Sequence, residues 1–152
     1  MWYRVFALEP DMPQPAFLQE HLKSLGVDVP LQVRGDDLGW TALSLQLAEN
    51  SPPLELQRYL AEEDDIRDDL DAWAAWLEIQ EHEPDHVRLM QYVIGTQQLF
   101  TLHRPPDFAD EDLVDRICEG LAKFLASQCR GVYQIDGKGF FAANGMRIMQ
   151  EH

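Results

Sequence analysis

The sequence of 152 residues contains 27 acidic and 12 basic side chains, which gives a formal net charge of −15. Its hydrophobic fraction of 45% excludes an intrinsically disordered chain despite this charge, and its length fits one domain over 1–152. The negative charge argues against binding to nucleic acid or to an anionic membrane surface, because both would repel the chain.

Two further features indicate a cytoplasmic protein. No apolar run approaches 18 residues, and the N-terminal segment lacks the basic region of a signal peptide, so neither a membrane-spanning helix nor a leader is expected. Cys118 and Cys129 are the only cysteines and lie eleven residues apart in one helical pattern. Their side chains would not meet in a disulfide, so we expect buried, reduced thiols.

The first part of the chain predicts a strand, a helix and a strand pair. The apolar segment 2–8 has strand character, and 16–25 has the spacing of a helix that ends at Gly26. Segments 29–33 and 40–47 follow as an antiparallel pair, since residues of the second alternate between apolar and polar.

The range 52–80 is the longest helical pattern in the sequence. Its apolar residues recur at spacings of three, four or six, as on an amphipathic helix: Leu56, Leu60, Ile66, Leu70, Trp73 and Leu77. Seven acidic residues within 62–71 place like charges three or four apart, and one straight helix would be ~43 Å long. We therefore predict a break near Asp64 and Asp65, with an aspartate capping the second half.

A hairpin is predicted next, from 87–94 and 98–103 around Gly95-Thr96, and Pro105 and Pro106 are expected to end it.

The last part of the chain predicts a third helix and a strand meander. The helix covers 110–128, and the tail over 132–149 follows it. Asp136-Gly137 and Asn144-Gly145 in this tail are dipeptides typical of type I′ turns. Hairpins that alternate with helices indicate an α+β fold with an antiparallel or mixed sheet. We expect about three helices packed on one face, with ferredoxin-like character as one form of this fold.

Charge is concentrated in segment 55–85, where twelve acidic and two basic residues contribute −10 of the net −15. An aromatic side chain among carboxylates suits the recognition of a basic protein surface. The main hypothesis is a non-enzymatic protein-interaction domain, for example an inhibitor or immunity-like protein with a basic partner. Its predicted binding residues are Glu62, Asp64, Asp65, Asp68, Asp69, Asp71 and Trp76. The competing interpretation is that Trp73 and Trp76 both pack on the sheet.

The alternative hypothesis is a small metal-dependent hydrolase. Residues 82–86 match the H-E-x-x-H pattern, in which a helix places His82 and His86 on one face to bind zinc while Glu83 activates water. Pro84 lies inside the motif and opposes the required helix. A hard cation bound by the aspartates is a weaker alternative.

No motif predicts a cofactor, and the oligomeric state is left open. A third possibility is a stable domain whose acidity serves solubility and whose function lies in a pocket that no motif marks.

Overall fold

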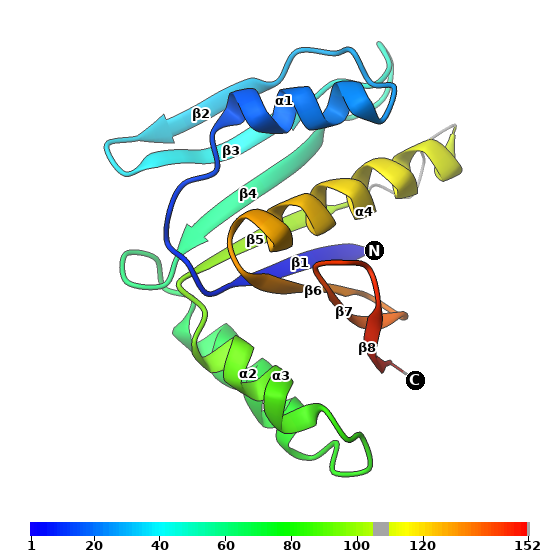
Figure 1. The fold of residues 1–152 in the computed structure, drawn as a ribbon. Helices are drawn as coiled ribbons and strands as arrows, with labels where there is room; N and C mark the ends of the chain where they lie inside the picture. The colour runs from blue at the N-terminus through cyan, green and yellow to red at the C-terminus, as the bar shows by residue number, and fades with distance from the viewer. Residues whose placement is uncertain (105–109, 152) are drawn as a thin grey trace.

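The computed structural model describes residues 1–104 and 110–151, and these residues contain four α-helices and eight β-strands (Figure 1). In chain order the elements are β1 (Trp2–Ala7), α1 (Pro15–Ser24), β2 (Gln32–Asp36), β3 (Gly39–Leu45), β4 (Leu54–Leu60), α2 (Arg67–Glu78), α3 (His86–Ile94), β5 (Gln98–His103), α4 (Glu111–Gln128), β6 (Gly131–Ile135), β7 (Gly139–Ala142) and β8 (Arg147–Gln150). No helix among the described residues is long and apolar enough to cross a membrane.

The eight strands form one sheet in the order β2-β3-β4-β5-β1-β6-β7-β8. All neighbouring strands in this order are antiparallel, which confirms an α+β fold with an antiparallel sheet. The ferredoxin-like character stays a prediction. Strand β1 lies between β5 and β6, so that Val5 is opposite Phe100 on one side and Tyr133 on the other. The first strand of the chain therefore joins the two halves of the sheet.

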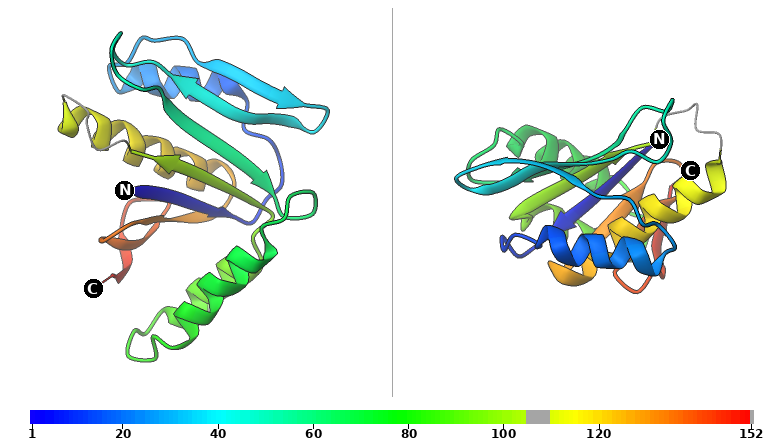
Figure 2. Two further views of the ribbon diagram at one scale, coloured as in Figure 1. Left: turned by 180° about the vertical axis from the view of Figure 1, so that it is seen from behind. Right: turned by 90° about the horizontal axis from the view of Figure 1, so that it is seen from above.

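The helices cover both faces of the sheet, so the prediction that they pack on one face is wrong. Helices α1 and α4 share a hydrophobic cluster with Tyr3 and Val5, whereas α2 and α3 share a second cluster with Phe6. The left view of Figure 2 looks onto the sheet with α1 and α4 behind it. Val5, Phe6 and Ala7 are consecutive and all buried, and consecutive strand residues are buried only when both faces are covered.

The long helix predicted over 52–80 is also wrong in its first half. Residues 54–60 form strand β4, and the helix α2 begins only at Arg67. Leu56 and Leu60, four apart, also fit a period of two, and pairing with β3 and β5 selects the strand. The chain does break near Asp64, but no aspartate caps α2. Instead, Asp64 Oδ2 accepts a hydrogen bond of 2.7 Å from the backbone N–H of Leu60 at the end of β4.

The strand predicted over 87–94 is the helix α3, so the hairpin around Gly95-Thr96 does not form. β-Branched residues favoured the strand, but Leu89 and Val93, four residues apart, are fully buried within the cluster that includes α2. Helices α2 and α3 thus form a helical hairpin, which stands apart from α1 and α4 in Figure 1.

Other predicted elements are confirmed, among them the first strand and the first and last helices. The antiparallel β2–β3 pair also forms, but its first strand is Gln32–Asp36 and not 29–33. The C-terminal meander is also confirmed, but its turns are not of type I′. Gly137 and Gly145 have positive φ angles, whereas Asp136 and Asn144 do not, and a type I′ turn requires both. Pro105 and Pro106 lie outside the described residues.

Candidate functional site

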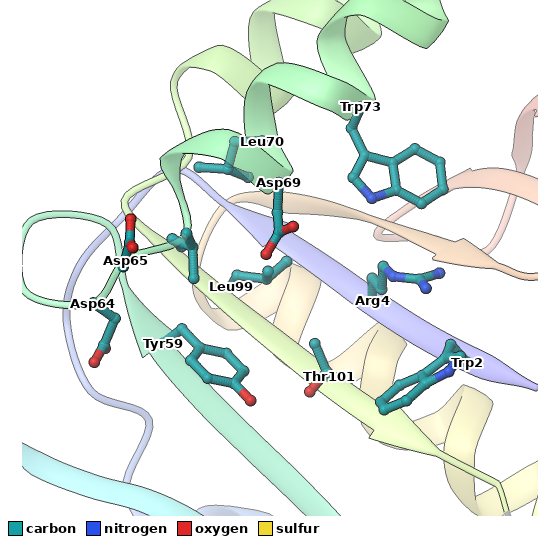
Figure 3. Close-up of a pocket in the computed structure, with 11 residues that line it drawn as sticks. Trp2, Arg4, Tyr59, Asp64, Asp65, Asp69, Leu70, Trp73, Leu99 and Thr101 are labelled. Atoms are coloured by element: carbon teal, nitrogen blue, oxygen red, sulfur yellow. The ribbon is translucent and has the colours of Figure 1, made fainter.

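A cleft of about 490 Å³ lies between the start of α2 and the sheet face that α2 covers (Figure 3). Every second residue of neighbouring strands forms its floor, because alternate side chains of a strand point to the same face of the sheet. The strands β1, β4 and β5 contribute Trp2, Arg4, Tyr59, Leu99 and Thr101. The turn before α2 and the helix itself contribute Asp64, Asp65, Ile66, Asp69, Leu70 and Trp73.

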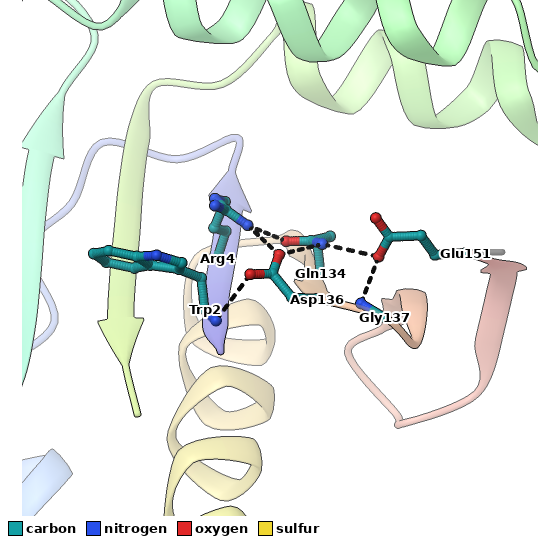
Figure 4. Close-up of polar contacts among 6 residues, drawn as sticks. All are labelled: Trp2, Arg4, Gln134, Asp136, Gly137 and Glu151. Carbon is teal, nitrogen blue, oxygen red and sulfur yellow. Dashed lines mark hydrogen bonds and ion pairs between the residues drawn. The ribbon is translucent and has the colours of Figure 1, made fainter. Parts of the chain in front are cut away.

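Arg4 is the cationic group of the cleft, and its charge is compensated from the neighbouring strand. Its Nη1 donates hydrogen bonds to Asp136 Oδ1 at 2.7 Å and to Gln134 Oε1 at 2.8 Å (Figure 4). The guanidinium also lies 5.1 Å from the ring centroid of Trp73 and 5.8 Å from that of Trp2. Two indole faces and a carboxylate therefore fix this side chain.

A small hydrogen-bond network holds Asp136 in place beneath Arg4. Gln134 Nε2 and the backbone N–H of Trp2 donate to its two carboxylate oxygens, at 3.1 Å and 3.0 Å. Burial alone would raise the pKa of Asp136, but the hydrogen bonds from Arg4, Gln134 and Trp2 outweigh it and lower the pKa. Glu151 extends the network by accepting from the N–H of Gly137 at 2.8 Å.

The predicted acidic residues are all exposed, but the structure brings only three of them into the cleft. Asp64, Asp65 and Asp69 line it, whereas Glu62 lines a separate cleft beside Arg58. Asp68 and Asp71 are exposed on α2 and are not among its lining residues. Among the described residues, none of these six carboxylates takes part in an ion pair. The cleft thus carries three uncompensated negative charges at one end.

Trp73 and Trp76 are half-buried and belong to an aromatic cluster on the sheet. Trp73 packs edge-on against Phe6 and Phe140, with ring centroids 6.0 Å and 5.8 Å apart. Trp76 stacks on Phe140 at 6.4 Å. Both tryptophans therefore pack on the sheet, as the competing interpretation held, and each also leaves part of its ring accessible.

Two hydroxyl groups complete the floor of the cleft. The Tyr59 hydroxyl donates to the Gln57 side chain on the same strand. The Thr101 Oγ1 atom is buried and has no hydrogen-bond partner in the part of the chain that the structure describes. A buried hydroxyl without a partner costs about 1–3 kcal/mol.

The residues of the H-E-x-x-H pattern do not form a metal centre. His82 is exposed, and its Nε2 lies 3.8 Å from the carboxylate of Glu83. His86 begins α3, and its Nδ1 is 3.1 Å from the Leu77 carbonyl oxygen, so this ring connects α3 to α2. Within residues 1–104 and 110–151, no group of three or more His, Cys, Asp or Glu side chains is arranged to hold a metal ion.

The sequence did not reveal the floor of the cleft. Trp2, Arg4 and Thr101 come from strands that precede or follow the acidic segment by many residues, and only the sheet order places them beneath α2. The alternation of Trp2, Arg4 and Phe6 along β1 was a usable signal, because it marks a second sheet face that needs a cover.

No family model matches the chain, and no significant match was found among curated proteins or solved structures. The function is therefore inferred from the geometry of this cleft and of the acidic residues around it.

Proposed function

We propose that this protein is a non-enzymatic interaction domain that binds a basic segment of another protein. The proposed binding residues, which we call the acidic surface, are Glu62, Asp64, Asp65, Asp68, Asp69, Asp71 and Trp76. The observation that supports the proposal most is that these carboxylates are exposed and form no ion pair with the described residues.

Uncompensated carboxylates favour a basic partner for two physical reasons. Their summed field accelerates the encounter with positive charge, which makes the association rate sensitive to salt. Several arginines elsewhere in the described residues pair with acids outside the acidic surface, for example Arg4 with Asp136 and Arg104 with Asp115. The acidic surface therefore keeps its charge available.

The half-buried tryptophans add an apolar contact to this charge. Trp76 and Trp73 border a shallow depression together with Asp69 and Glu151, so aromatic surface and carboxylates lie side by side. Interfaces combine such an aromatic anchor with a polar rim. An inhibitor or immunity-like protein that neutralises a basic partner is the most specific form of this proposal. Nucleic acid and anionic membranes are disfavoured partners because the same field repels them.

The test uses a fluorescent arginine-rich peptide and measures its anisotropy as protein is added. The variant Asp64→Asn, Asp65→Asn, Asp68→Asn, Asp69→Asn should bind at least ~10-fold more weakly than the wild type. The matched control neutralises four exposed acids outside the acidic surface, Glu20→Gln, Asp28→Asn, Glu49→Gln and Asp112→Asn, and has the same net charge.

The control variant should bind the peptide almost as tightly as the wild type. Equal weakening in both variants would show that the peptide senses only net charge, and the proposal would then be abandoned. An acidic peptide and a DNA duplex serve as probes that should not bind.

A further inference from the structure

The separate cleft beside Arg58, which we call the Arg58 pocket, lies where β4 ends and combines a buried cation, exposed carboxylates and apolar side chains. We propose that it binds a free α-amino acid with an apolar side chain. The site differs from the cleft beneath α2 and needs no protein partner.

The charge of Arg58 has no counter-ion in the described structure. Arg58 is 5% exposed, and it forms no ion pair within residues 1–104 and 110–151. Its Nε and Nη1 atoms donate to neutral oxygens, those of the Gln98 side chain and of the Leu38 and Trp40 carbonyls. Nη2 makes no hydrogen bond with the described residues. Because an unpaired buried charge is costly, a carboxylate that entered the pocket and accepted from Nη2 would be stabilised.

The other charges of the pocket exclude a simple anion as its ligand. Glu62 and Glu63 line the pocket and are exposed, and neither forms an ion pair with Arg58. Asp36 and Asp64 add negative charge nearby without contacting Arg58. These carboxylates would repel acetate or phosphate, but they would attract an ammonium group. A ligand that carries both a carboxylate and an ammonium group satisfies both signs of charge.

The apolar lining selects the third part of the ligand. Pro10, Leu38 and Leu60 line the pocket, and Leu38 is 52% exposed although its side chain is apolar. An apolar side chain of the ligand would cover Leu38 and remove apolar area from water. The volume of about 230 Å³ lies below the ~300–1,000 Å³ of pockets for drug-sized ligands, so the pocket suits one small molecule.

The proposed contacts account for each part of an amino acid such as leucine. Its carboxylate accepts a hydrogen bond from Nη2 of Arg58, its ammonium donates to Glu62 or Glu63, and its side chain lies against Leu38. Such a ligand has no net charge, so the net charge of −15 of the chain does not repel it.

The test titrates the full chain with L-leucine and follows the NMR signals of the tryptophan indole N–H groups. The centroid of the Trp40 ring lies 5.8 Å from the Arg58 guanidinium, so the Trp40 signal should shift. Trp73 is the internal reference, because it packs in the cluster on the opposite face of the sheet. L-leucine amide lacks the carboxylate and N-acetyl-L-leucine lacks the ammonium. Each should bind at least ~10-fold more weakly than leucine.

Substitutions in the pocket separate the contributions. The double variant Glu62→Gln, Glu63→Gln should weaken leucine binding at least ~10-fold, because it removes the charge that attracts the ammonium. The matched control Glu20→Gln, Asp112→Asn neutralises two exposed acids outside the pocket and should bind like the wild type. Arg58→Met should abolish binding.

The thermal unfolding midpoint of each variant establishes that it is folded. If Arg58→Met is not folded, the ligand series on the wild type and the glutamate variant still decide.

Three results would overturn the proposal. The first is equal binding of leucine and either of its two derivatives. The second is equal weakening by the glutamate variant and its matched control. The third is the absence of a Trp40 shift at ~10 mM leucine, a concentration that nearly saturates a site with a Kd of ~1 mM.

Discussion

Arg58 and Gln98 form a buried pair that connects β4 to β5 on the sheet face opposite the cleft. Arg58 Nε donates to Gln98 Oε1 at 2.8 Å, and the two side chains are 5% and 0% exposed. Nη1 of Arg58 donates to the carbonyl oxygens of Leu38 and Trp40. Gln98 in turn donates to the carbonyl oxygens of Glu9 and Asp11 in the loop after β1. One buried cation thus ties together three strands and a loop.

Replacement of Arg58 by Met should lower the free energy of unfolding by about 1–3 kcal/mol. The substitution leaves Gln98 and two carbonyl oxygens without their donor in a buried environment, and unsatisfied buried groups are costly. Urea unfolding measures the change. Arg34→Met is the control, because Arg34 is exposed and its ion pair with Glu55 should contribute less than about 1 kcal/mol. Equal losses in the two variants would contradict this account.

Asp136 should make stability depend on pH in the acidic range. Although burial opposes it, hydrogen bonding lowers the pKa of Asp136 in the folded protein below the ordinary value of 3.8. A carboxyl group whose pKa is lower in the folded than in the unfolded protein contributes its full stabilisation at a pH above the unfolded pKa. This contribution disappears as the pH falls through the folded pKa. The stability difference between wild type and Asp136→Asn should therefore be greatest above pH 3.8 and shrink at lower pH. A difference that does not vary with pH would refute the assignment.

Much of the fold could be predicted from the sequence because the apolar residues of most segments fit either the period of a helix or that of a strand, but not both. The helix α4 has a single apolar stripe, with Ile117, Leu121 and Leu125 each four apart, and no strand accommodates it. The predictions for 54–60 and 86–94 were wrong because the apolar residues of each segment fit both the period of a helix and the period of a strand. Tertiary contacts selected the element in each case, since β4 pairs with β3 and β5, and α3 packs on α2. Short ambiguous segments need tertiary contacts that no local pattern contains.

The candidate site was predictable only on its acidic side. The run of aspartates is visible in the sequence, so Asp64, Asp65 and Asp69 could be predicted as site residues. Arg4 and Thr101 carry no local signal, because their importance depends on the position of β1 beside β5 in the middle of the sheet. Such a strand order depends on how the helices pack on both faces of the sheet, and the local pattern of residues along the sequence does not contain this information.

Both cysteines should be unreactive in the native protein. Burial raises the pKa of Cys118 to about 12 and that of Cys129 to about 11, so almost no thiolate is present near neutral pH. Iodoacetamide should label neither thiol in the folded protein at pH ~8 and both in denaturant, as mass spectrometry would show. Rapid native labelling of Cys118 would contradict the burial of its side chain, which α4 directs into the hydrophobic core.

His86 should act as a structural residue at the junction of α2 and α3. Its ring makes a hydrogen bond with the Leu77 carbonyl oxygen, so His86→Ala should lower the free energy of unfolding by about 1 kcal/mol. His82→Ala should leave stability nearly unchanged, because His82 is exposed and makes only a 3.8 Å contact with Glu83. Elemental analysis of the same three proteins addresses the hydrolase alternative. That alternative requires stoichiometric zinc in the wild type and its loss in both variants, whereas a structural His86 predicts equal background zinc in all three. The combination of reduced stability and unchanged metal content would assign His86 to helix packing, and the opposite combination would restore the metal site.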